Sequence, residues 1–176
     1  MSNIIPEKGI NYRCYLNGGE FLGSVSEGTF PNFEAMTSEV RGAGLAGVVD
    51  SPTVGHLNSM TMSLTWRTVT SAYITLMIPR AHDVDLYASM QQFDAGLGIY
   101  RTVPIHVFVK AIPKNITPGN LVVSDVMGTQ DEFEITYIKI ELDGREVVEV
   151  DKYNYVFKIR GVDYLASVRS DLGMQA

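Results

Sequence analysis

The sequence has little cysteine and no long apolar run. Its single cysteine, Cys14, excludes an internal disulfide and favours a reducing compartment. Cys14 lies in the apolar segment YRCYL, which favours a packing role over a nucleophile. No apolar run approaches the ~20 residues that a membrane-spanning helix requires, so we predict no membrane insertion. The start, MSNIIPEKGI, has no basic segment followed by an apolar one, which predicts no secretory signal.

An excess of positive charge is also missing. The 20 Asp and Glu outnumber the 14 Lys and Arg, for a formal net charge of −6. This balance argues against a protein that grips nucleic acid phosphates. The imbalance is concentrated in residues 131–151, which carry eight acids and two bases. We therefore expect one distinctly acidic region on an otherwise neutral chain.

Motifs for catalysis are absent as well. His56, His82 and His106 lack metal-ligand spacing, and the chain has no G-x-S-x-G or Walker sequence. His106 lies opposite the apolar positions of its segment, which favours a surface histidine. We predict no catalytic residue, no cofactor and no metal, and hence a protein that is not an enzyme.

Residues 42–47, GAGLAG, match the G-x-G-x-x-G fingerprint of dinucleotide-binding proteins. That site needs a buried strand before the glycines, a helix after them and an acid about 20 residues further on. Here the polar MTSEVR precedes, VVDSPTVGHLNSM follows, and Asp50 is too close. The glycines instead predict a long loop over residues 42–56 that joins two strands and becomes ordered against a partner.

Alternation with a period of two dominates the chain and predicts a mainly β fold. It is clear in SMTMSLTWR, DVDLYASMQ and VPIHVFVKA, and YRCYL and FLGSV predict a hairpin around a glycine turn. The predicted core positions of the three alternating segments are Met60, Met62, Leu64, Trp66, Val84, Leu86, Ala88, Met90, Val103, Ile105, Val107 and Val109.

Helices are predicted only as accessories. One spans Ser71–Ile78, with Thr70 or Ser71 as its N-cap and Pro79 as its stop. The other spans Val162–Leu172 and is closed by a glycine. Residues 112–130 contain two prolines and two glycines, and predict a polar connection.

Residues 137–150, YIKIELDGREVVEV, predict a hairpin with a type I′ turn at Asp143-Gly144, where both residues need positive φ. In strict register Leu142 faces Arg145, and one face then carries four acids without a nearby cation. These acids are Glu132, Glu134, Glu149 and Asp151. Like charges opposite one another destabilise a sheet. Two interpretations remain open: a solvated surface, or a negative surface that repels an anion.

The strict register also predicts a local irregularity. It places Tyr153 and Tyr155 on the acidic face, although the alternation of residues 152–160 is that of a strand with an apolar side. A bulge or a change of packing partner near Asp151 would resolve the conflict.

The order of these features resembles the major tail tube protein of contractile-tailed phages, a family shared with R-type bacteriocins. The resemblance covers roughly residues 10–173, and residues 70–130 match it only in outline. The segments that carry it are NYRCYLNGGEFLGSV, TFPNF, VRGAGLAGVVD, SLTW and YIKIELDGREVVEVDKYNYVFKIRGVDYLASVRSDLG.

The resemblance implies one domain over residues 1–176, with an N-terminal arm over residues 1–10. The subunit would be an antiparallel β-sandwich or barrel with one or two short helices. Six copies would form a ring, and rings would stack into a hollow tube with a continuous inner β-barrel that leaves no free sheet edge. Other partners would be the sheath, tape-measure and baseplate proteins. DNA would pass through without specific binding, or ions would leak in a bacteriocin.

The family also implies where the protein resides and what its unusual segments do. It would be made in the host bacterial cytoplasm and reside in a virion tail or bacteriocin particle. The four acids would face the channel, where negative charge repels phosphate. The loop over residues 42–56 would stack on a neighbouring subunit or ring through Gly42, Gly44, Leu45, Gly47, Val48, Val49 and Asp50.

Alternatives from other classes fit the same residues. The tube of a related contractile secretion apparatus would share the fold and move protein effectors. A monomeric β-sandwich binding module would never polymerise. An enzyme is the third alternative, and the lack of convergent polar residues argues against it.

Overall fold

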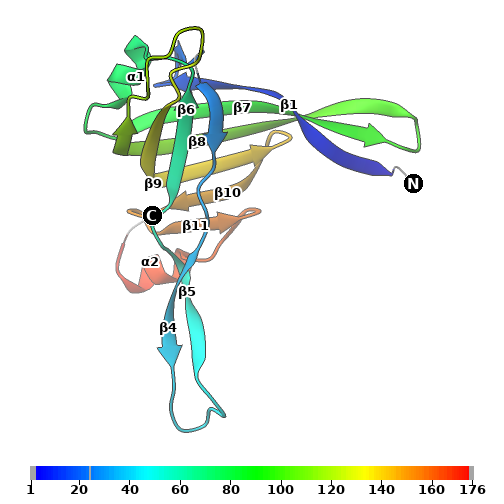
Figure 1. Cartoon of the computed structure of the whole chain (residues 1–176). Coiled ribbons are helices and arrows are strands. Elements are labelled where there is room, and N and C mark those ends of the chain that lie inside the picture. Colours follow the sequence, from blue (N-terminus) through cyan, green and yellow to red (C-terminus); the bar gives the residue numbers. More distant parts are fainter. Residues whose placement is uncertain (1–2, 24, 175–176) are drawn as a thin grey trace.

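The structure, a computed structural model, describes residues 3–23 and 25–174. Within them the chain forms a ten-stranded antiparallel sheet, a two-stranded antiparallel sheet and two short helices (Figure 1). The predicted mainly β class with short helices is confirmed. The strands are β1 (Ile4–Leu16), β2 (Glu20–Phe21), β3 (Val25–Thr29), β4 (Ala35–Val40), β5 (Val49–Leu57), β6 (Thr61–Trp66), β7 (His82–Asp94), β8 (Ile99–Thr117), β9 (Thr129–Leu142), β10 (Arg145–Asp151), β11 (Val156–Ile159) and β12 (Val162–Asp163). The helices are α1 (Ser71–Leu76) and α2 (Ala166–Asp171).

Strand β9 is the branch point of the main sheet. One of its edges pairs with β8, whereas the other pairs first with β6 and then, from Tyr137 onward, with β10. A β-bulge at Thr136 marks this change of partner, since the register against β8 steps from Tyr137 directly to Ile135. The main path runs β12-β11-β10-β9-β8-β7-β1-β2, and β6 carries β3. The sheet curls, so that Gly28 of β3 lies against Leu86 of β7.

The hydrophobic core lies inside this curl. Three alternating residues of β6, and the residue just before that strand, are at most 1% exposed, as their pattern predicted: Met62, Leu64, Trp66 and Met60. Val84, Leu86, Val107 and Val109 of β7 and β8 are buried too. The predicted core positions Ala88, Met90, Val103 and Ile105 are only partly buried. Met90 and Val103 lie where β1, β7 and β8 run beyond the body as a three-stranded extension (Figure 1), and Ala88 and Ile105 lie at its base, where β9 ends.

The first predicted helix is confirmed as α1, whereas the second, α2, is shorter than predicted. Thr70 caps α1 by accepting a hydrogen bond from the Tyr73 amide at 3.2 Å. The predicted helix from Val162 begins only at Ala166, because Val162 and Asp163 pair with β11 as a strand.

The predicted connection over residues 112–130 is strand at both of its ends. β8 continues to Thr117 and β9 begins at Thr129, so the irregular part is only residues 118–128. A second bulge, between Pro113 and Asn115, carries β8 past its proline. The predicted strand at residues 152–155 is a turn between β10 and β11, with Tyr155 at a φ of 52°.

Two projecting segments differ from the predicted arm and loop. Residues 4–10 of the expected N-terminal arm belong to β1 and pair with β7, and residues 1 and 2 lie outside the described residues. The predicted loop over residues 42–56 is corrected, because residues 49–56 form most of β5 and pair with β4. The hairpin β4–β5 projects from the body (Figure 1). Among the described residues, we find no helix that is long and apolar enough to span a membrane.

Candidate assembly surfaces

The acids predicted for the channel lie on the polar face of the main sheet. Because of the bulge at Thr136, Glu132 and Glu134 share that face of β9 with Tyr137, although their sequence positions differ in parity. Glu149 and Asp151 of β10 stand opposite Lys139 and Tyr137, on the same face. The structure therefore brings all four predicted acids to one surface.

The hairpin register that led to these acids was wrong in one respect. The type I′ turn is present, with φ of 52° at Asp143 and 71° at Gly144, and Leu142 faces Arg145 as predicted. A bulge at Val147 then shifts the pairing by one residue. As a consequence, the acids lie on the face opposite to the apolar residues of β9 and β10, and not on their face.

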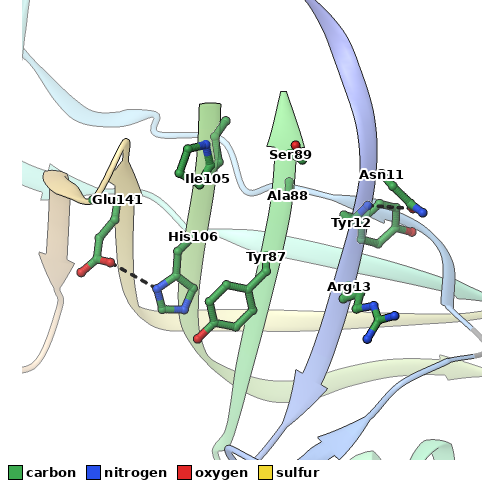
Figure 2. A pocket seen from close by; sticks show the side chains of 11 residues that line it. Asn11, Tyr12, Arg13, Tyr87, Ala88, Ser89, Ile105, His106 and Glu141 are labelled. Atoms are coloured by element: carbon green, nitrogen blue, oxygen red, sulfur yellow. Dashed lines mark hydrogen bonds and ion pairs between the residues drawn. The ribbon is translucent and has the colours of Figure 1, made fainter. Parts of the chain in front are cut away.

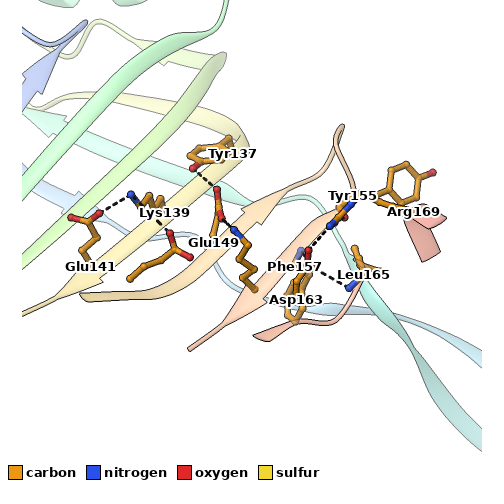
Figure 3. Close-up of polar contacts among 11 residues, drawn as sticks. Tyr137, Lys139, Glu141, Glu149, Tyr155, Phe157, Asp163, Leu165 and Arg169 are labelled. Carbon is orange, nitrogen blue, oxygen red and sulfur yellow. Dashed lines mark hydrogen bonds and ion pairs between the residues drawn. The ribbon is translucent and has the colours of Figure 1, made fainter. Parts of the chain in front are cut away.

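The one-residue shift also places the acids next to lysines that the strict register did not reveal. Lys158 Nζ lies 2.6 Å from a carboxylate oxygen of Glu149, and Lys152 Nζ lies 3.0 Å from one of Glu134. Tyr137 donates its hydroxyl to Glu149 at 2.9 Å (Figure 3). Asp151 accepts hydrogen bonds from the backbone of the turn that follows it. The face is an ion-paired surface, and the expectation of acids without nearby cations was wrong.

These pairs keep the carboxylates ionised. The hydrogen bond from Lys158 lowers the pKa of Glu149 against the opposing effect of burial, with further help from Tyr137. Burial disfavours the charged form of Glu134, but hydrogen bonds from Ser59 and Lys152 outweigh it and lower its pKa.

Acids nevertheless outnumber bases on this face. Glu141 and Glu146 stand directly opposite one another, with Lys139 Nζ at 2.7 Å from the first and 4.0 Å from the second. The strand positions that register places on the face include the acids Asp83, Asp85, Glu132, Glu134, Glu141, Glu146, Glu149 and Asp151 and the bases Arg13, Lys110, Lys139 and Lys158. Individual charges form local ion pairs, but the net charge of the surface stays negative.

His106 lies in a cluster on the same face. Its Nε2 is 2.8 Å from Asp85. Its Nδ1 is 3.3 Å from Glu141, and its ring stacks on Tyr87 with centroids 4.2 Å apart (Figure 2). The side chain is 26% exposed, so the predicted surface histidine is partly exposed and contacts two carboxylates. A cleft of about 460 Å³ beside it is also lined by Ser89. Because both imidazole nitrogens contact carboxylates, neither is available to activate a serine.

The surroundings of the single cysteine favour a structural role. Burial raises the pKa of the Cys14 thiol to about 12, which suppresses the thiolate that nucleophilic attack requires. The described residues contain no group of three or more His, Cys, Asp or Glu placed to hold a metal ion.

The hairpin β4–β5 is the second candidate surface. Its apolar side chains are exposed over both strands and the loop between them: Met36 47%, Val40 45%, Leu45 46%, Val48 61%, Val49 51% and Val54 61%. The predicted stacking residues Gly42, Gly44, Leu45, Gly47 and Val48 lie in the loop, and Val49 and Asp50 begin β5. Exposed apolar surface of this extent on a thin projection is typical of a segment that binds another protein.

An antiparallel sheet with a polar, ion-paired face and a projecting hairpin of exposed apolar side chains is typical of a structural subunit that assembles with other chains. The chain belongs to the phage tail tube protein FII family, whose model matches residues 6–173. It is therefore a tail tube structural protein of a contractile tail-like apparatus and a phage tail component, and its family is non-enzymatic.

The chain is also similar to two individual proteins. The tail tube protein of Escherichia phage P2 is 25% identical over 177 residues, covering 97% of this chain and 99% of that protein. A chain of the sheath–tube complex of the PVC extracellular contractile injection system, in its extended state, is 15% identical. It has a TM-score of 0.52 and covers 78% of this chain and 90% of its own, so it supports the fold.

Proposed function

We propose that this chain forms hexameric rings that stack into the inner tube of a contractile tail, and that the tube conducts DNA during ejection. In this assembly, strands from six subunits close a continuous inner β-barrel. Sheath, tape-measure and baseplate proteins are the other proposed partners, and the virion tail is the proposed location.

The observation that carries the proposal is the open edge on each side of the three-stranded extension. Pairing between β8 and β9 begins at Ile105, so residues 99–103 of β8 have β7 as their strand partner on one side only, among the described residues. Residues 4–12 of β1 likewise have β7 as their only strand partner within the described part of the chain, since β2 reaches only Tyr15 and Leu16. Unpaired strand edges of this length are templates for pairing with further strands. In a closed ring of subunits, both edges of the extension would be paired with strands of neighbouring copies.

The polar face supports a channel role. A net negative surface repels the phosphates of DNA, and its ion pairs hold the side chains in place, so DNA can slide without adhering. We therefore place Glu132, Glu134, Glu149 and Asp151 on the channel wall. The hairpin β4–β5 would reach a neighbouring ring through its exposed apolar side chains.

Electron microscopy of the concentrated protein tests the assembly. We expect hollow tubes of stacked six-fold rings. Deletion of residues 42–47 should leave a folded subunit that no longer polymerises, and normal tubes from that variant would remove the stacking role of the hairpin. A protein that stays monomeric at every concentration would favour the binding-module alternative.

The channel role is tested by neutralising the four acids as E132Q, E134Q, E149Q and D151N. We expect DNA to be retained by the tube and ejection to slow, whereas the control D125N/D171N removes exposed charge elsewhere and should have no effect. Unchanged ejection by the fourfold variant, from tubes of normal appearance, would exclude the role of these acids.

The tube of a contractile injection or secretion apparatus is the second candidate function, supported by the fold it shares with a chain of an injection-system complex. Sheath and tape-measure genes beside this one would favour a tail, and toxin or effector genes an injection device. A bacteriocin particle would lack a capsid and leak ions through the same tube.

A further inference from the structure

The root of the β4–β5 hairpin touches the body at a close contact between Gly55 and Leu165. An ideal Cβ at Gly55 would lie 2.6 Å from Cγ and 2.7 and 2.8 Å from the two Cδ atoms of Leu165, closer than side-chain atoms approach one another. Gly55 also has a φ of +67°, which residues with a side chain rarely adopt. The position is therefore restricted to glycine by its backbone and by its neighbour.

Leu165 is itself held firmly. It is 2% exposed, and its backbone amide donates to the carboxylate of Asp163 at 3.1 Å. That carboxylate also pairs with Arg169 of α2 at 2.6 Å and accepts the amide of Phe157 at 3.4 Å (Figure 3). The backbone of Leu165 is therefore tied to the junction of β11, β12 and α2, and its side chain is enclosed.

Further contacts surround the Gly55–Leu165 contact. The rings of His56 and Tyr155 meet edge to face with centroids 6.1 Å apart. Lys152 Nζ donates to the backbone carbonyl of Asn58 at 3.0 Å and pairs with Glu134 at the same distance. The hairpin root is thereby linked to the polar face of the main sheet.

We propose that the Gly55–Leu165 contact sets the angle at which the β4–β5 hairpin leaves the body, and that the two are positioning residues for docking to a second copy of this chain. This inference rests on the proposed stacking role of the hairpin. A two-stranded ribbon has little stability of its own, so its direction depends on its root. A preset direction lowers the entropic cost of docking, and a small rotation at the root displaces the tip by much more.

Three variants isolate the contact. Gly55→Ala introduces both the positive-φ penalty and the clash. The control Gly44→Ala lies in the same hairpin at a φ of +96° with nothing within 4 Å, so it carries the penalty without the clash. Because all three close atoms of Leu165 lie beyond its Cβ, Leu165→Ala in the Gly55→Ala background opens the space again.

The readout is the distance between spin labels at Ala46→Cys, in the hairpin loop, and Arg80→Cys, on the body, measured in dilute solution below the concentration at which tubes form. Both positions are exposed, and the native Cys14 is buried. We expect Gly55→Ala to shift or broaden the distance distribution, the double variant to move it back, and Gly44→Ala to leave it unchanged. Leu165→Ala alone, which keeps Gly55, should broaden the distance distribution. This variant tests the contact if Gly55→Ala fails to fold. Unchanged distributions in both Gly55→Ala and Leu165→Ala would overturn the inference.

Tube formation is then scored by sedimentation. We expect a loss of at least tenfold in sedimented protein for Gly55→Ala, recovered in part by Leu165→Ala. A shifted hairpin that still yields wild-type amounts of tube would overturn the positioning role. Normal tubes after deletion of residues 42–47 would overturn the stacking role itself, so the two failures are distinguishable.

Discussion

The body of the subunit and the β4–β5 hairpin consist of the same kind of strand, yet they differ in how they are stabilised. In β6 and the adjoining half of β9, alternate side chains are at most 1% exposed. In the hairpin, both sides of each strand face solvent for most of its length. Burial of apolar surface is the main force that stabilises a fold. The body therefore acquires its stability within one chain, whereas the apolar surface of the hairpin stays exposed in the single chain.

Removal of a large side chain from the body should have the greatest effect on subunit stability. Phe133 is 0% exposed, so Phe133→Ala should cost about 3–5 kcal/mol of unfolding free energy through lost burial and a residual cavity. Urea denaturation measures this cost. Phe33→Ala, at a position that is 44% exposed near the hairpin, is the matched control and should cost far less.

A buried acid in the body should make its stability depend on pH. Asp131 is 1% exposed, and burial raises its pKa to about 6, with Trp66 and Tyr73 offsetting only part of the effect. Since the folded pKa lies above the unfolded value of 3.8, the folded state loses stability as pH rises from about 4 to about 6. The expected loss is on the order of 2–3 kcal/mol.

Asp131→Asn should remove this contribution. As pH rises from 4 to 7, the wild type should therefore lose more unfolding free energy than the variant does. Urea denaturation at each pH measures both values. Asp125→Asn, on an exposed loop, should show no such shift. An equal pH dependence for Asp131→Asn and wild type would mean that Asp131 is not the responsible group.

The ion pairs of the polar face should contribute less. Lys158→Gln removes the partner of Glu149, and because the pair is partly exposed we expect a loss of up to about 1 kcal/mol at pH 7. The depressed pKa of Glu149 means that this stability is lost as pH falls through the folded pKa. NMR titration should show the pKa of Glu149 rising in Lys158→Gln and staying constant in the control Lys8→Gln.

The hairpin tip should show the smallest effect on the subunit and a large one on assembly. Leu45→Ser with Val48→Ser should change the unfolding free energy by less than about 0.5 kcal/mol, because both side chains are exposed. Sedimentation should show the loss of tubes. Ala46→Ser, between them, should retain both properties. A clear loss of subunit stability in the double variant would contradict the contrast between body and hairpin.

Local chemistry allowed the body to be predicted well. The alternation of residues 60–66 identified four core residues, the Thr70 cap and Pro79 located α1, and Asp143-Gly144 specified a type I′ turn. The long loop and the second helix were predicted less well. The exposed β5 has no apolar alternation to reveal a strand, and residues 162–163 are strand only because β11 lies beside them.

The acidic face shows where prediction from sequence ends. The four acids were chosen correctly as members of one face, but their cations Lys152 and Lys158 were missed, and Asp131, one of the eight acids counted in residues 131–151, lies in the core. Each error follows from a bulge or a turn that no pattern marks. Side chains alternate with a period of two, so one extra residue exchanges the faces of everything beyond it.

The sequence by itself determined the β class, the core of β6, the turn at Asp143-Gly144 and the family, because these depend on neighbours along the chain. Only the tertiary structure decided which charges are paired, which acid is buried and where the hairpin leaves the body. Those properties depend on strand register and on contacts such as that of Gly55 with Leu165, which join residues far apart in the sequence.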